Sequence, residues 1–126
     1  MSRLTDEIEM NSGDAKVYYE RGVAQFELQD YHGTIAELTK AVEIDPNNKW
    51  SYLYLGIAKM GLIDYPGAIA DINQAIILNP TFTAAYYGRG LLKIELGQVD
   101  SGLSDLNKAS ELSKSEIFEE VDISCN

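Results

Sequence analysis

Cysteine and histidine are almost absent from this chain, and each shortage excludes a class of site. Cys125 is the single cysteine among 126 residues, so neither an internal disulfide nor a cysteine-based metal cluster can form. Its place one residue from the end predicts an exposed tail thiol. His32 is the single histidine, stands beside Asp30, and has no nucleophile near it in the sequence. We therefore expect no catalytic residues, no metal, no cofactor and no enzymatic activity.

Positive charge and long apolar runs are also scarce. Ten Lys and Arg stand against twenty Asp and Glu, a formal net charge of -10. This balance argues against nucleic acid as a partner, because binding it requires a basic face. No run approaches the roughly 18 apolar residues of a membrane span, so no membrane insertion is expected. The acidic opening MSRLTDEIEM lacks the apolar core of a secretory signal, which favours a cytoplasmic protein.

What the chain has in abundance is internal repetition at a stride of 34 residues. The strongest matches are Tyr18, Tyr52 and Tyr86, then Gly22, Gly56 and Gly90, then Leu28, Leu62 and Leu96. Pro46 and Pro80 close two units, and Lys114 stands where a third proline would fall. The sequence predicts three repeats at 15–48, 49–82 and 83–116. A polar segment, 1–14, precedes them, and a tail or partial capping helix, 117–126, follows.

Each repeat contains two segments with helical periodicity and a turn between them. In the stretch GLIDYPG, residues 61–67, Asp64 suits a helix cap and Pro66 a first helical turn. Prolines end the second helix of a repeat, after which Asn48 or Thr81 is expected to cap the next helix. NSGD, residues 11–14, is interpreted as another cap. The chain is therefore predicted to be a series of helix pairs.

Small residues recur where the two helices of a pair should approach most closely. Glycine inside a helix costs roughly 1 kcal/mol relative to alanine. That cost is present three times at one repeat position, at Gly22, Gly56 and Gly90. We expect a neighbouring helix to lie too close for a side chain there.

These positions resemble the tetratricopeptide repeat family over about 15–116. The second repeat matches its pattern best, with Tyr52, Gly56, Tyr65, Ala68, Ile72, Ala75 and Pro80. The third departs most, with Val99, Gly102 and Lys114 at pattern positions. The resemblance implies an all-α fold, a right-handed α-solenoid of three tandem helix-turn-helix repeats, whose first helices line a concave face. It also implies an adaptor or scaffold that holds a peptide or helix of a partner protein.

An apolar stripe on the first helices is the candidate partner-binding groove. Repeat positions 2, 5, 9 and 12 share one helical face and are almost all apolar or aromatic. With Tyr54, a groove position of the family, the candidate residues are Tyr19, Val23, Phe26, Trp50, Leu53, Tyr54, Ile57, Met60, Tyr87, Leu91 and Ile94. One interpretation is an open groove that receives an amphipathic or extended partner segment. The alternative is that adjacent helices, or the chain's own tail, cover the stripe.

The resemblance also excludes one class of ligand. Chaperone-binding members grip a C-terminal carboxylate with Lys, Asn and Arg side chains. The matching positions here carry Tyr19, Val23, Tyr54, Ala84 and Gly88, none of them cationic or an amide. Binding of acidic chaperone tails is therefore not expected.

Two arginines interrupt the apolar pattern beside the packing glycines. Arg21 and Arg89 precede Gly22 and Gly90, while acidic residues recur in the second helices at Glu37, Asp71 and Asp105. We predict that Arg21 pairs with Glu37, and Arg89 with Asp71 or Asp105, because partly buried charges need partners. The alternative is two arginines on a solvated face.

The end of the third repeat suggests a second function. Without proline at 114, the last helix is expected to continue past 112 and to present Ile117, Phe118 and Val121. These residues would fold back as a cap or dock on another copy, because a solenoid end without a cap exposes apolar surface. A self-associating structural module, including a homodimer, is thus the alternative to an adaptor.

Overall fold

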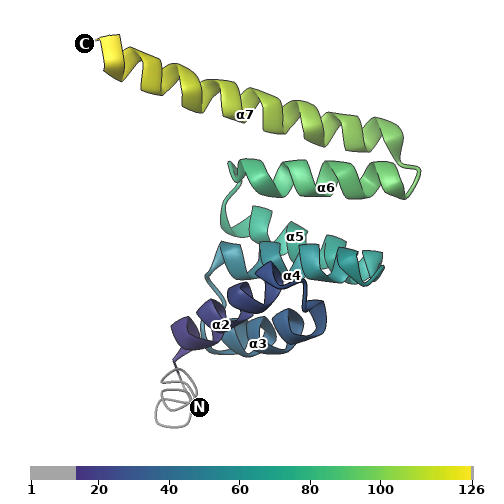
Figure 1. Ribbon diagram of the computed structural model, residues 1–126. Helices are drawn as coiled ribbons and strands as arrows, with labels where there is room; N and C mark the ends of the chain where they lie inside the picture. Colours follow the sequence, from purple (N-terminus) through teal and green to yellow (C-terminus); the bar gives the residue numbers. More distant parts are fainter. Residues whose placement is uncertain (1–13, 126) are drawn as a thin grey trace. The chain divides into compact units, whose positions relative to one another are not determined.

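The structure, a computed structural model, describes residues 14–125, with side chains described for residues 14–115. Within this range the chain forms six α-helices and no strand (Figure 1). They are α2 (Ala15–Glu27), α3 (Tyr31–Ile44), α4 (Lys49–Gly61), α5 (Tyr65–Leu78), α6 (Thr83–Glu95) and α7 (Val99–Cys125). The all-α fold predicted from the repeats is confirmed. The chain divides into two compact units, one carrying α2 to α5 and one carrying α6 and α7.

Helix starts follow the predicted caps, with one exception. Asp14 caps α2 by accepting from Lys16 N, and Asn48 caps α4 by accepting from the next helical N–H groups. Asp64 accepts a hydrogen bond from Gly67 N at 3.1 Å. The prediction for Thr81 was wrong. Phe82 takes the cap position of α6 without a side-chain hydrogen bond, and the Thr81 hydroxyl instead donates to Asn79 Oδ1.

The turns inside the three pairs share one backbone conformation. Each pair bends through a residue with positive φ: Gln29 at 61°, Ile63 at 63° and Gly97 at 84°. This left-handed region suits glycine and strains other residues, β-branched ones most of all. The third turn therefore has the residue that its geometry favours, whereas the first two do not.

Close packing at the repeated glycines is confirmed. A Cβ on Gly22 would lie 2.8 Å from the Leu38 side chain, and one on Gly56 would lie 2.6 Å from Ile72. On Gly90 it would lie 2.8 Å from the carbonyl oxygen of Gly102. In the α6–α7 pair two glycines thus meet, and the backbones themselves limit the approach.

One core cluster of the first unit lies between α3 and α4, where its two helix pairs meet. Leu38 and Ala41 of α3 and Leu55 of α4 form a buried cluster, against which Tyr18, Ile35 and other partly buried residues pack. Within this unit α3 contacts both α2 and α4, and α2 also contacts α4. The first helices of the two repeats, which carry the predicted stripe, are therefore neighbours.

Helix α7 is much longer than the other second helices. It spans 27 residues and continues to Cys125, as the missing proline predicted. The side chains of Ile117, Phe118 and Val121 lie outside the described part of the chain. Across the described residues, no helix combines the length and apolar character that crossing a bilayer demands.

Candidate functional site

Aromatic side chains gather on α2 and α4 of the first unit. The Tyr54 ring lies edge-on to Phe26 and Tyr19, at centroid distances of 5.1 and 6.4 Å, and 6.5 Å from Trp50. Phe26 also contacts Tyr31, at 5.9 Å. We call these five residues the aromatic patch. Such ring geometries stabilise a cluster beyond simple burial, so the patch is a preformed surface.

The patch differs in accessibility across its width. Trp50 is 43% exposed, whereas Tyr19, Phe26, Tyr31 and Tyr54 are half-buried. The indole of Trp50 is therefore the exposed rim of the patch, and the other four rings are more enclosed. Burial and the neighbouring Tyr54 raise the pKa of the Tyr19 hydroxyl, which keeps it protonated and able to donate a hydrogen bond.

Tyr31 was not predicted as part of this surface. It is the first residue of α3, and its ring lies against Gly61 at the end of α4, where a Cβ would come within 2.5 Å of the ring. The sequence contained a signal for this contact at the repeat position of Gly61, which is glutamate in the other two repeats, at Glu27 and Glu95. A glycine found in only one repeat leaves room there for an aromatic ring.

The other predicted stripe residues of the first unit separate by burial. Val23, Ile57 and Met60 are half-buried. Leu53, at 4% exposed, belongs to the core and offers no surface to a partner. In this unit the stripe residues are thus partly exposed and partly packed in the core.

The second unit presents a separate apolar surface on α6. Tyr87 and Leu91, one helical turn apart, are 56% and 42% exposed. Ile94 is half-buried, and its side chain lies where a Cβ on Gly102 would be. Tyr87 and Leu91 therefore form the accessible part of this stripe, while Ile94 packs toward α7.

Ion pairs join the two helices of every repeat, and those of Arg21 with Glu37 and of Arg89 with Asp105 confirm the prediction. The pairs are Arg21–Glu37 at 3.5 Å, Lys59–Asp71 at 2.7 Å, and Arg89 and Lys93 to Asp105 at 2.8 and 3.0 Å. Burial raises the pKa of Asp105, but hydrogen bonds from Arg89 and Lys93 outweigh it, so the pKa lies below its ordinary value. These charged side chains pair with each other between the two helices of a repeat, so we assign them a structural role.

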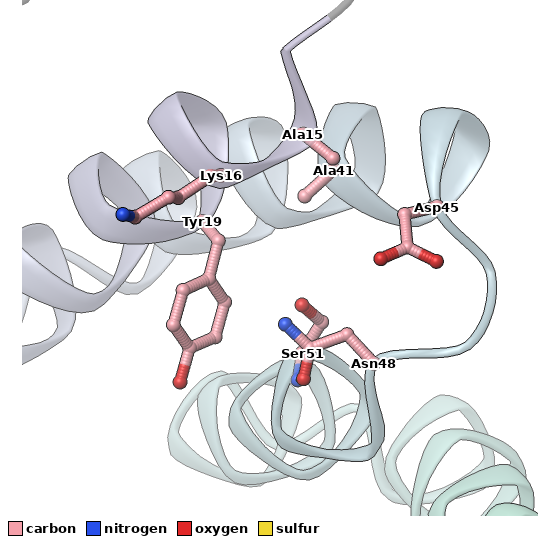
Figure 2. Close-up of a pocket in the computed structure, with 7 residues that line it drawn as sticks. All are labelled: Ala15, Lys16, Tyr19, Ala41, Asp45, Asn48 and Ser51. Atoms are coloured by element: carbon pink, nitrogen blue, oxygen red, sulfur yellow. The ribbon is translucent and has the colours of Figure 1, made fainter.

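A small pocket opens where α2, the end of α3 and the start of α4 meet (Figure 2). Its volume is about 120 Å³, and its lining residues are Ala15, Lys16, Tyr19, Ala41, Asp45, Asn48 and Ser51. Figure 2 shows Tyr19 extending from α2 toward the start of α4, with the Asp45 carboxylate on the other side of the opening. Tyr19 thus belongs both to the pocket and to the aromatic patch.

The arrangement is suited to contact with another molecule. Among the described residues, no group of three or more His, Cys, Asp or Glu could hold a metal ion. His32 is exposed on α3. Aromatic and apolar side chains, with a small pocket beside them that is lined by both polar and apolar groups, are the features that protein and peptide ligands use.

Sequence comparison identifies the first and third repeats independently. The family model described as tetratricopeptide repeat matches residues 15–48 and 83–116, more than half of the chain. No curated protein matches the chain in sequence.

Solved structures with the same fold are numerous. A crystal structure of MamA superposes with a TM-score of 0.85 at 24% identity, over 90% of this chain and 67% of that one. The Arabidopsis OM64 TPR domain gives 0.77 at 21% identity, over 80% and 84% of the two chains. The first TPR of Spaghetti (RPAP3), bound to the HSP90 peptide SRMEEVD, gives 0.75 at 25% identity, over 89% and 94%. This chain spans about two thirds of the MamA chain.

Proposed function

The chain belongs to the tetratricopeptide repeat family, and from this premise we propose that it is a non-enzymatic interaction module. Its partner is a peptide or helix of another protein, held on the apolar stripe of the first helices. The observation that carries this proposal is Trp50, whose indole is 43% exposed at the rim of the aromatic patch. Tryptophan and tyrosine dominate binding hot spots, and a large exposed indole is otherwise disfavoured.

Preorganisation supports the same proposal. Tyr54 contacts Tyr19, Phe26 and Trp50 through edge-on or tilted ring pairs. A partner would therefore meet side chains that are already held in place, which lowers the entropic cost of ordering an interface. In the second unit, Tyr87 and Leu91 form a separate exposed apolar surface on α6.

The partner segment is apolar and not acidic. The chain carries a formal charge of -10, which repels an acidic ligand. The RPAP3 domain is bound to the acidic peptide SRMEEVD. In this chain, however, the positions with which chaperone-binding relatives hold a carboxylate are Tyr19, Val23, Tyr54, Ala84 and Gly88. A ligand rich in Leu, Ile or aromatic residues, neutral or basic, fits this surface better.

Selection from a random peptide library displayed on phage tests the proposal. Binding of selected peptides is measured by isothermal titration calorimetry on the wild type and on Trp50→Ala. We expect the variant to weaken binding at least about thirtyfold, because a hot-spot residue contributes about 2 kcal/mol or more. Ile77→Ala is the matched control, since Ile77 on α5 is an apolar residue that is 70% exposed. Equal affinity in the wild type and both variants, or no selectable peptide, contradicts the proposal.

Self-association is a second candidate, and one observation favours it. Tyr31 and Ile35 of α3 are partly covered, Tyr31 against Gly61 of α4 and Ile35 against the cluster that includes Leu55. The matching residues of α7, Val99 and Leu103, are each 47% exposed. This face would dock on another copy, with Ile117, Phe118 and Val121 extending the same helix.

Light scattering across a concentration series separates the two candidates. If α7 mediates assembly, mass rises with concentration and Leu103→Glu restores the monomer, whereas Ile77→Glu does not. A constant monomer mass at high concentration contradicts self-association and leaves the adaptor role unaffected.

A further inference from the structure

The pocket beside the aromatic patch is lined by a serine whose buried hydroxyl makes no hydrogen bond with the described residues. Ser51 is 1% exposed, and its Oγ has no hydrogen-bond partner among the described residues. Ser51 N is already satisfied, because it donates to Asn48 Oδ1. A buried unpaired hydroxyl destabilises a fold, and an alanine would fit the same place in the helix without that penalty. The hydroxyl of Ser51 therefore has no evident role in stabilising the fold and is available to a ligand.

The polar groups around the pocket define which ligand group would fit. Asn48 uses its Oδ1 to cap α4, accepting from Trp50 N and Ser51 N, so its amide nitrogen is left as a donor. Asp45 accepts from Asn47 N with one oxygen, Oδ1, and its second oxygen is an acceptor. Tyr19 supplies a protonated hydroxyl. The pocket thus combines donors at the start of α4 with an acceptor at the end of α3.

We propose that this pocket binds the primary carboxamide of a glutamine or asparagine side chain on the partner peptide. The carbonyl oxygen accepts from Ser51 Oγ and the Asn48 amide, and the NH₂ group donates to Asp45. Figure 2 shows the Lys16 ammonium group directed away from Asn48 and Ser51, so Asp45 is the charged group that faces the opening. A carboxylate would be repelled by Asp45, and an ammonium group would leave the donors at the start of α4 unpaired. The volume of about 120 Å³ is well above the roughly 10 to 15 Å³ that a single water molecule needs, so a short amide side chain fits.

The inference rests on the proposed function and adds specificity to it. Because Tyr19 lines the pocket and also contacts Tyr54 at 6.4 Å, the carboxamide would lie next to the aromatic patch. The recognised segment would then carry an apolar residue on the patch and an amide residue close to it. A site that hydrogen-bonds a ligand group rejects analogues that lack it, since its own buried polar groups are then left unpaired.

NMR titration of the full chain with N-acetyl-glutamine-N-methylamide tests the site directly. The backbone N–H of Ser51 and the side-chain NH₂ of Asn48 are followed in ¹H–¹⁵N spectra. We expect saturable shifts with a Kd on the order of millimolar, as for other fragments of this size. The corresponding leucine, glutamate and lysine derivatives should produce none. The absence of saturable shifts, or equal shifts with all four probes, overturns the inference.

Two variants give sharper outcomes. Ser51→Ala should weaken the glutamine probe at least about fivefold while leaving the melting temperature unchanged or higher. A lower melting temperature would show a structural bond to the hydroxyl and overturn the inference. Asp45→Asn should remove the repulsion of a carboxylate and bring the glutamate probe to within a few-fold of glutamine; continued exclusion of glutamate overturns it.

The outcomes also distinguish this inference from the proposed function. If library-selected peptides lose affinity in Trp50→Ala but bind Ser51→Ala and wild type equally, the pocket is not used and the aromatic patch still is. If Trp50→Ala has no effect, the proposed function itself has failed.

Discussion

Arg89 and Asp105, on the paired helices α6 and α7, form a bidentate ion pair in which Nε and Nη2 of the arginine each lie 2.8 Å from a carboxylate oxygen. The side chains are 20% and 9% exposed. Bidentate, charge-assisted bonds are among the strong polar interactions of proteins. The pair therefore links the two helices of the second unit.

Replacing Arg89 with leucine should therefore destabilise the chain. We expect a loss of about 1 to 2 kcal/mol, because Asp105 stays buried with Lys93 remaining beside it. Urea unfolding followed by circular dichroism measures the change. Arg21→Leu is the matched control, since its pair with Glu37 is longer, at 3.5 Å, and more exposed. It should cost less than about 1 kcal/mol, and a larger loss there than at Arg89 contradicts this account.

The same pair predicts a dependence on acid. The pKa of Asp105 is below its ordinary value of 3.8 in the folded state. The stability it contributes is then complete above about pH 4 and is lost as pH falls through the lower folded pKa. The difference in unfolding free energy between wild type and Asp105→Asn should be constant from pH 7 to about 4 and shrink below it. If this difference in unfolding free energy instead grows below pH 4, the pKa of Asp105 is raised in the folded state, which contradicts the prediction.

Relief of strain at the second turn should stabilise the chain. Ile63 has φ of 63° and is 72% exposed, so its side chain adds little packing. A non-glycine residue in this conformation destabilises the fold by about 1 to 2 kcal/mol. Glycine removes this strain, but it also makes the unfolded chain more flexible, which offsets part of the gain. We expect Ile63→Gly to add several tenths to about 1 kcal/mol, measured by urea unfolding.

The matching substitution in the third turn should act in the opposite direction. Gly97 has φ of 84°, and a Cβ there would meet nothing within 4 Å. Any loss in Gly97→Ala therefore reports backbone strain alone. If Ile63→Gly destabilises and Gly97→Ala does not, the turns are not strained as described.

Close backbone approach in the last pair gives a further prediction. A Cβ on Gly90 would lie 2.8 Å from the Gly102 carbonyl oxygen and 2.9 Å from the Leu106 side chain. Alanine gains roughly 1 kcal/mol of helix propensity, but overpacking costs about 1 to 3. We expect Gly90→Ala to lower the melting temperature, whereas Ser104→Ala, on the exposed side of α7, should leave it unchanged or raise it. A rise with Gly90→Ala contradicts the close contact.

The sequence was sufficient for the fold because its signals repeat. Glycines at 22, 56 and 90 predicted close helix packing, and the charges at 21, 89, 37 and 105 predicted ion pairs. The glycine occurs three times, and the arginine with its acidic partner occurs twice, at the same spacing of 34 residues. The cap at Thr81 failed because Asn79, with an equally suitable side chain, accepts the hydrogen bonds of that turn.

The candidate site was predicted less completely, since burial depends on neighbours that a helical pattern does not reveal. Leu53 shares a helical face with Trp50 and Ile57, yet the packing of the first unit buries it. Tyr31 joins the aromatic patch from α3, which the stripe on the first helices did not include. The pocket around Ser51 arises from three helices and has no signature along the chain.

The proposed binding role is tested most directly by the indole Nε1–H resonance of Trp50 during titration with a library-selected peptide. If a partner segment lies on the aromatic patch, this resonance shifts saturably, with the same Kd as calorimetry and with a shift among the largest in the spectrum. If the indole resonance does not move while signals elsewhere, such as those of Ile77 on α5, follow the binding curve, the patch is not where the protein holds its partner.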